Sequence, residues 1–302
     1  MSRHPDESRY LARTADSTPL GNLVRYPSPM PSVAARTGRG ARSAVAALIT
    51  VAFVLPFVIL VSGSLRSTGV PPVAAPALVP RDATLDNYVS LLEGGSFERA
   101  VLNSLLVAAV AVPLGVVVAS WAGFAAARLP RRAGIAVALA AVAAASIPSS
   151  ATFVGRLAAF RWLGITDTPL PLIAPALIGV SPLLVLLFAW SYATLPPSLY
   201  DVARGSGLGP MATWWRVALP LRRDVAGIAA AVAFVVTWGD FVDPLVYVYD
   251  ERWYTLPMAL ASLAALPPTD QPVMLAAAVV AVLPVVLVFV LASRRLLRSE
   301  RP

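Results

Sequence analysis

Hydrophobic residues fall into six long runs that are separated by more polar stretches. Each run has about the 20 residues that an α-helix needs to cross the hydrocarbon core of a bilayer. Five of the runs contain an internal proline, and in the remaining run, residues 225–247, Pro244 lies near the end. A helix bundle tolerates such prolines when neighbouring helices satisfy the freed carbonyls. The pattern predicts an all-α polytopic membrane domain over residues 42–298, with transmembrane helices at residues 44–61, 101–127, 133–154, 170–193, 225–247 and 273–293.

The first 41 residues show no apolar period and are rich in Arg, Asp, Ser, Pro and Gly. Such a segment buries too little apolar surface to offset the entropy of ordering it, so residues 1–41 are predicted to form a disordered tail. The apolar run that follows lies too deep in the chain, and is too long, for the hydrophobic region of a secretory signal.

The arginines indicate the orientation of the helices. If both termini are cytoplasmic, the cytoplasmic segments hold eighteen arginines and the outer loops hold six. Acidic residues gather in the outer loops. This distribution follows the positive-inside rule, and it predicts a multi-pass protein of the cell membrane with both termini and the 195–224 loop in the cytoplasm.

Composition supports the membrane interpretation and excludes several kinds of chemistry. The 302 residues are 58% hydrophobic and only 13% charged, against about 25% charged residues in soluble domains. The chain has no cysteine and no lysine, and its one histidine is His4, in the polar tail. No catalytic residues, metal ligands or bound cofactor are therefore expected. The net charge of +8 reflects topology, and binding to nucleic acid is not expected.

The cytoplasmic loop at residues 195–224 is longer than a simple connection between helices requires. Its sequence predicts a short helix, a glycine-rich bend and a second helix that contains Trp214 and Trp215. Two interpretations are open. The loop is an interfacial hairpin with both tryptophans in the headgroup region, or it projects into the cytoplasm and docks on a soluble partner through Asp201 and Arg204.

The same loop resembles the EAA loop of permeases in ABC importers, and in particular the six-span permeases of the carbohydrate-uptake class, which include the maltose type. Further segments share the resemblance, which covers about residues 42–298. Ala203, Gly207 and Pro220 match the family pattern. Asp201 replaces its glutamate, Val202 its first alanine, Ser206 its aspartate and Leu208 the alanine after the glycine. The segments are 102–105, 123–129, 167–169, 201–208, 215–221 and 238–241.

The resemblance implies an ABC type I importer permease fold and a set of partners. These are a second permease in a heterodimer, two ATPase subunits, an extracytoplasmic solute-binding protein and membrane lipid. ATP and magnesium would bind to the ATPase subunits. Residues 199–215 would form the coupling helix that enters a cleft of the ATPase. The expected coupling residues are Asp201, Val202, Ala203, Arg204, Gly207, Leu208, Trp215 and Pro220.

The path of the solute is less marked in the sequence. Trp238, Asp240 and Asn103 are candidates for a polar, sugar-binding cavity, because an aromatic face beside hydrogen-bonding groups suits a sugar. For Asn103 the notable alternative is a hydrogen bond between helices. For Asp240, the alternative is a position near the outer interface.

Three other functions remain open. An ABC permease could carry a non-sugar solute such as a polyamine or a phosphorylated polyol. A secondary transporter would show internal repeats and titratable residues at mid-membrane, which the sequence lacks. A membrane-embedded enzyme would need catalytic residues at depth, and only Asp240 and Asp243 offer any.

Overall fold

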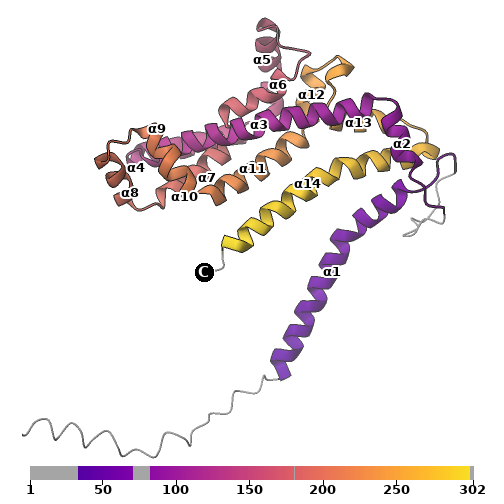
Figure 1. Cartoon of the computed structure of the whole chain (residues 1–302), viewed down its shortest axis with the longest axis horizontal. Coiled ribbons are helices and arrows are strands. Elements are labelled where there is room, and N and C mark those ends of the chain that lie inside the picture. Colours follow the sequence, from indigo (N-terminus) through magenta and orange to yellow (C-terminus); the bar gives the residue numbers. More distant parts are fainter. Residues whose placement is uncertain (1–32, 71–81, 180, 300–302) are drawn as a thin grey trace, which may run out of the picture. The chain divides into compact units, whose positions relative to one another are not determined.

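The computed structural model describes residues 33–70, 82–179 and 181–299 (Figure 1). Every regular element in these ranges is a helix, which confirms the all-α prediction. The chain divides into two compact units, residues 1–56 and 57–302. Most of the predicted disordered tail, residues 1–32, lies outside the described residues.

Helix α1 (Val33–Ser64) supplies the described part of the first unit and continues into the second. It begins earlier than the pattern predicts, so residues 33–41, which were assigned to the tail, are helical. Alanine and arginine have high helix propensity, and both occur just before the apolar run. Residues 42–64 then form an apolar helix of spanning length.

Helix α3 (Ser96–Ala127) lies at the centre of the second unit. It contacts α7 (Pro182–Ala193), α11 (Arg223–Trp238) and α13 (Leu256–Leu263). Small residues allow this close approach. At Gly123, an added Cβ would lie 2.5 Å from the Cβ of Phe188 and 2.8 Å from the backbone nitrogen of Ala189. Glycine is therefore required where α3 crosses α7.

The third apolar run forms two helices instead of the predicted single one. Helices α4 (Arg131–Ser146) and α5 (Ser149–Trp162) meet at an angle of 88°. Pro148 explains the break, because proline disfavours a helical backbone at the residue before it. Ile147 accordingly has an extended conformation, with ψ of 119°.

The fourth apolar run contains no charged residue in its sequence, but its backbone forms three short helical elements instead of one helix. It comprises α6 (Leu170–Ile173), the 3₁₀ helix η1 (Ala174–Ile178) and α7. Gly179 ends η1 with φ of +79°, a conformation that side chains disfavour. An added Cβ at Gly179 would also lie 3.0 Å from the Cβ of Ala119 on α3. The break therefore lies directly against α3.

The fifth run, predicted at residues 225–247, also breaks. Helix α11 ends at Trp238, and the short helix α12 (Val242–Tyr247) follows after three residues. The Asp240 carboxylate accepts hydrogen bonds from the backbone N–H groups of Val242 (3.1 Å) and Asp243 (3.2 Å). This carboxylate holds the first turn of α12 and so stabilises the break.

The remaining elements connect and complete the bundle. Helix α14 is the long last helix, and it packs against α11, α13 and α2. The bounds are α2 (Asp86–Glu93), α8 (Pro197–Gly205), α9 (Pro210–Thr213), the π-helical turn η2 (Trp214–Ala218), α10 (Leu219–Leu221), η3 (Glu251–Trp253), η4 (Pro268–Asp270) and α14 (Gln271–Ser299).

Four helical segments of the described chain are long and apolar enough to cross a membrane, and the bent α4–α5 pair would make a fifth. Helix α11, with 16 residues, is shorter than a full span. The chain is a multi-pass membrane protein. The count of six spans and the cytoplasmic position of both termini stay predictions.

Candidate functional site

Two sites stand out in the second unit: the α8–α9 loop and a polar cavity beside α5 and α12. In the loop, α8 ends in a Schellman turn. The backbone N–H of Gly207 donates to Arg204 O (3.0 Å), and that of Leu208 donates to Ala203 O (3.0 Å). Gly207 has φ of +76°. This bond pattern with a left-handed glycine is the usual end of a helix that turns back sharply. The predicted helix, glycine bend and second helix are all present.

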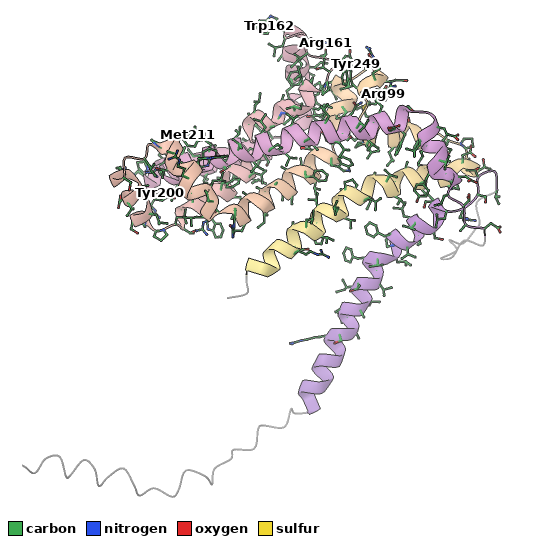
Figure 2. The ribbon with its side chains drawn as sticks, in the orientation of Figure 1. Arg99, Arg161, Trp162, Tyr200, Met211 and Tyr249 are labelled. Carbon is green, nitrogen blue, oxygen red and sulfur yellow. The ribbon has the colours of Figure 1, made fainter. Side chains whose placement is uncertain are left out.

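The loop has a buried face and an exposed face. Ala203, Thr213 and Trp214 are buried. The exposed side chains combine charge with apolar surface. Four of them are residues expected for coupling, namely Asp201, Val202, Arg204 and Trp215, and Met211 is an exposed neighbour of these. Tyr200 and Met211 mark this end of the unit in Figure 2. An exposed surface of this mixed kind suits a protein partner.

Tyr200 fixes α8 to the bundle. Its hydroxyl donates to the backbone oxygen of Tyr192 (3.1 Å) on α7. The Arg128 guanidinium, at the end of α3, lies 4.6 Å from the centre of the Tyr200 ring and 5.1 Å from that of Phe124. Burial raises the pKa of Tyr200, and the Arg128 charge opposes this shift. The contacts tie α8 to both α3 and α7.

Trp214 fixes the second half of the loop. Its indole N–H donates to Ser120 Oγ (2.9 Å), which lies 2.7 Å from Tyr192 Oη. All three side chains are buried, and the ring of Trp214 contacts that of Trp121 edge-on at 5.2 Å. Trp214 is only 4% exposed, so the interfacial-hairpin interpretation is wrong for this residue, because the core of the bundle holds the ring.

Two other residues expected for coupling, Leu208 and Pro220, lie after the glycine turn. Leu208 is half-buried after the turn, and Pro220 is exposed in the short helix α10. Arg222 follows α10 and donates through Nη2 to Thr194 Oγ1 (2.7 Å) at the end of α7. The segment after η2 is thus also bonded to the bundle.

The polar cavity has a volume of about 890 Å³. Residues of α3, α4, α5, η1, α11 and α12 line it. Most of the lining is hydroxyl or apolar side chains, and three charged residues are present: Arg156, Asp240 and Asp243. The structure therefore places Asp240, one of the three predicted path residues, on a cavity wall.

Arg156 and Asp243 form a bidentate ion pair between α5 and α12. Arg156 Nη1 donates to Asp243 Oδ1 (3.2 Å), and Nη2 donates to Oδ2. The guanidinium also lies 5.1 Å from the ring centre of Tyr247. Asp243 is only 8% exposed. A buried carboxylate needs such a partner, because an unpaired buried charge is costly.

Sequence reasoning missed Arg156 and assigned it to an outer loop. The predicted helix ended at residue 154, so the arginine fell just beyond it. Pro148 followed by Ser149, Ser150 and Thr152 was the available signal. A proline break and a cluster of hydroxyls within an apolar run indicate a polar lining.

Trp238 and Asn103 lie in different surroundings from Asp240. Trp238 donates its indole N–H to Ala281 O (2.9 Å) on α14 and stacks on Phe234. It lines a second cavity, of about 730 Å³, whose walls are apolar. The Asn103 amide donates to the backbone oxygens of Arg252 (2.8 Å) and Tyr254 (2.9 Å). Asn103 thus makes the structural hydrogen bonds that were its alternative role.

Within residues 33–70, 82–179 and 181–299, no group of three His, Cys, Asp or Glu residues could hold a metal ion. No family model matches the chain.

Curated relatives match most of the chain. The trehalose transport system permease protein SugB of Mycobacterium tuberculosis is 26% identical over 244 residues, which are 80% of this chain and 88% of the relative. The melibiose/raffinose/stachyose import permease protein MelC of Bacillus subtilis is 24% identical over 246 residues, 81% and 88% of the two chains. The chain resembles the permeases of carbohydrate ABC importers.

Solved structures agree with this permease assignment at the level of the fold. A bacterial ABC transporter involved in the import of the acidic polysaccharide alginate contains a chain with a TM-score of 0.72 and 17% identity, and the match covers 88% of this chain and 99% of that one. The alginate transporter in complex with a periplasmic protein bound to an alginate pentasaccharide gives a TM-score of 0.62 at 13% identity, covering 88% and 97%. The chain has the fold of an ABC importer permease.

Proposed function

We propose that the chain is the permease subunit of an ATP-driven ABC importer and forms half of the path for a sugar or oligosaccharide. The observation that carries the proposal is the α8–α9 loop, with its exposed Asp201, Val202 and Arg204 and its buried side bonded to α3 and α7. The relatives, which are permeases named for saccharides, support the choice of solute class.

In this proposal the loop couples the permease to ATP hydrolysis on a separate ATPase. ATP and magnesium bind to two ATPase subunits, and residues 199–215 enter a cleft on one of them. A helix pair that is fixed to the bundle can pass on a rigid-body movement, as switching between inward and outward access requires. The contacts of Tyr200 and Trp214 provide that fixed attachment.

A second permease would complete the path, and an extracytoplasmic solute-binding protein would deliver the saccharide. The solved neighbour in complex with a periplasmic protein supports the second of these partners. The half-open polar cavity beside α5 and α12 supports the first, because this chain alone does not enclose it.

Single-cysteine crosslinking tests the coupling role, since the chain has no cysteine of its own. Val202→Cys, on the exposed face of α8, should crosslink to an ATPase subunit in membranes of cells that produce the whole importer. The matched control is Trp162→Cys at the exposed tip of α5 (Figure 2), which should crosslink to the binding protein and not to the ATPase. Crosslinking of Val202→Cys to the binding protein alone would overturn the proposal.

A further inference from the structure

The polar cavity has an unbalanced charge. Of the described residues that line it, only Arg156, Asp240 and Asp243 are charged. Arg156 and Asp243 neutralise each other through two hydrogen bonds. The negative charge of Asp240 therefore has no paired cation on the cavity wall.

Asp240 also has a free acceptor atom. Its Oδ1 accepts the backbone N–H groups of Val242 and Asp243. Its Oδ2 has no hydrogen-bond partner within the described part of the chain. A second unused polar group lies on the wall at Thr255, which is 5% exposed and whose Oγ1 also has no partner there. Asp240 is half-buried, so its free oxygen faces the open cavity, whereas Thr255 Oγ1 is buried. Buried polar groups without partners are uncommon, and a bound ligand is one way to satisfy Thr255.

The surroundings of these groups suit a saccharide ring. Thr152 lies one helical turn before Arg156 on α5, and Phe153 also lines the cavity. Charged planar groups and hydroxyls can bond to the hydroxyl rim of a sugar, and an aromatic ring can pack on its apolar face.

We propose that Asp240, Arg156 and Thr255 form a saccharide subsite that accepts neutral or amine-bearing saccharides and disfavours uronates. A ligand carboxylate in this cavity would approach the unpaired Asp240 carboxylate, and like charges repel each other at close range. This inference rests on the proposed transport function and adds the charge of the solute to it. The selectivity is opposite to what a path for an acidic polysaccharide such as alginate requires.

The charge of the cavity is measurable directly. Thr152→Cys places a single thiol on the wall, where cationic and anionic methanethiosulfonate reagents of similar size react with it at rates that depend on the local potential. We expect the ratio of cationic to anionic rates to fall about tenfold in Asp240→Asn, which corresponds to about 1.4 kcal/mol. Asparagine keeps an oxygen for the backbone bonds of α12, so the break before α12 is preserved.

Asp250→Asn is the matched control. Asp250 lies in the loop after α12 and pairs with Arg252, and it does not line the cavity. Its substitution should leave the rate ratio at Thr152→Cys unchanged. An equal ratio in the Asp240→Asn variant and its parent would overturn the inference.

Protection of the same thiol identifies the ligand class. The whole importer with Thr152→Cys is treated with three disaccharides of matched size at millimolar concentration: neutral, amine-bearing and uronate. The first two should slow the modification and the uronate should not, and Asp240→Asn should remove this difference. Equal protection by the uronate in the parent would overturn the inference alone. If no disaccharide protects the thiol and none is taken up, the proposed transport of saccharides fails, whatever the charge measurement gives.

Discussion

Gly207 tests the coupling loop most sharply, because its geometry isolates one physical effect. Its φ of +76° lies in the left-handed region, and an added Cβ would have no atom within 4 Å. Gly207→Ala therefore causes no collision, and its cost is the backbone strain alone. That strain is about 1–2 kcal/mol for a residue with a Cβ.

The backbone strain in Gly207→Ala should weaken the binding of the permease to the proposed ATPase subunits. The strain favours conformations of the loop outside the Schellman turn, so binding of the proposed ATPase subunits to the turn should cost up to about 1–2 kcal/mol more than in the wild type. Such a change corresponds to a factor of roughly 5–30 in an equilibrium constant. The apparent affinity of the solubilised permease for the ATPase should fall by that factor, and uptake should fall with it.

Gly209→Ala is the matched control. Gly209 lies two residues later in the same loop, has φ of −70° and also has no atom within 4 Å of an added Cβ. Its substitution should leave ATPase retention within about twofold of the wild type. The assay is retention of ATPase subunits on the immobilised permease over a dilution series, with the permease itself quantified in the membrane. Equal retention in Gly207→Ala and the wild type, or an equal loss in Gly209→Ala, would refute the reasoning.

Three further predictions concern contacts of α3. Gly123→Val should destabilise the solubilised protein by several degrees in a thermal unfolding assay, because its Cβ would meet Phe188 at 2.5 Å; an unchanged midpoint would mean that α3 and α7 separate easily. Trp214→Phe removes the indole N–H that Ser120 accepts, while Ser120 keeps its hydrogen bond with Tyr192, so it should cost about 0.5–1.5 kcal/mol, and uptake should fall more than membrane abundance does if the bond transmits movement. Asn103→Ala leaves two backbone oxygens unbonded, which should cost about 1–3 kcal/mol, and a wild-type unfolding midpoint would contradict the structural role.

The apolar runs predicted the class of fold correctly, and the breaks within them were harder to predict. Pro148 was visible in the sequence, but a proline in a long apolar run is compatible both with a kinked span and with the observed 88° bend. Which one occurs depends on what the second helix packs against. The break after Trp238 similarly depends on Asp240, whose carboxylate replaces the interrupted helical bonds locally.

Some features of the candidate sites could be predicted from local sequence, and others depend on contacts between residues far apart in the chain. The glycine turn of the loop was predicted from local sequence, because a Schellman motif is determined by neighbouring residues. The Arg156–Asp243 pair joins residues 87 positions apart, and no local pattern specifies such a contact. Trp214 and Trp215 are adjacent and chemically identical, yet one is buried and the other exposed. Only the arrangement of α3 and α7 distinguishes them.

Helix α3 connects the loop to the opposite end of the bundle. Ser120 accepts the indole N–H of Trp214 at one end, and Ser104 accepts the backbone N–H of Leu256 (2.8 Å) at the other. Sixteen residues of one helix separate the two serines, which is about 24 Å at 1.5 Å per residue. Ser104 also lines the polar cavity. A movement of the loop that displaces Ser120 must therefore be absorbed along α3 or reach the cavity wall. Pro113 lies between the two serines and removes one helical hydrogen bond, so bending of α3 at this residue would decide how much of the movement arrives.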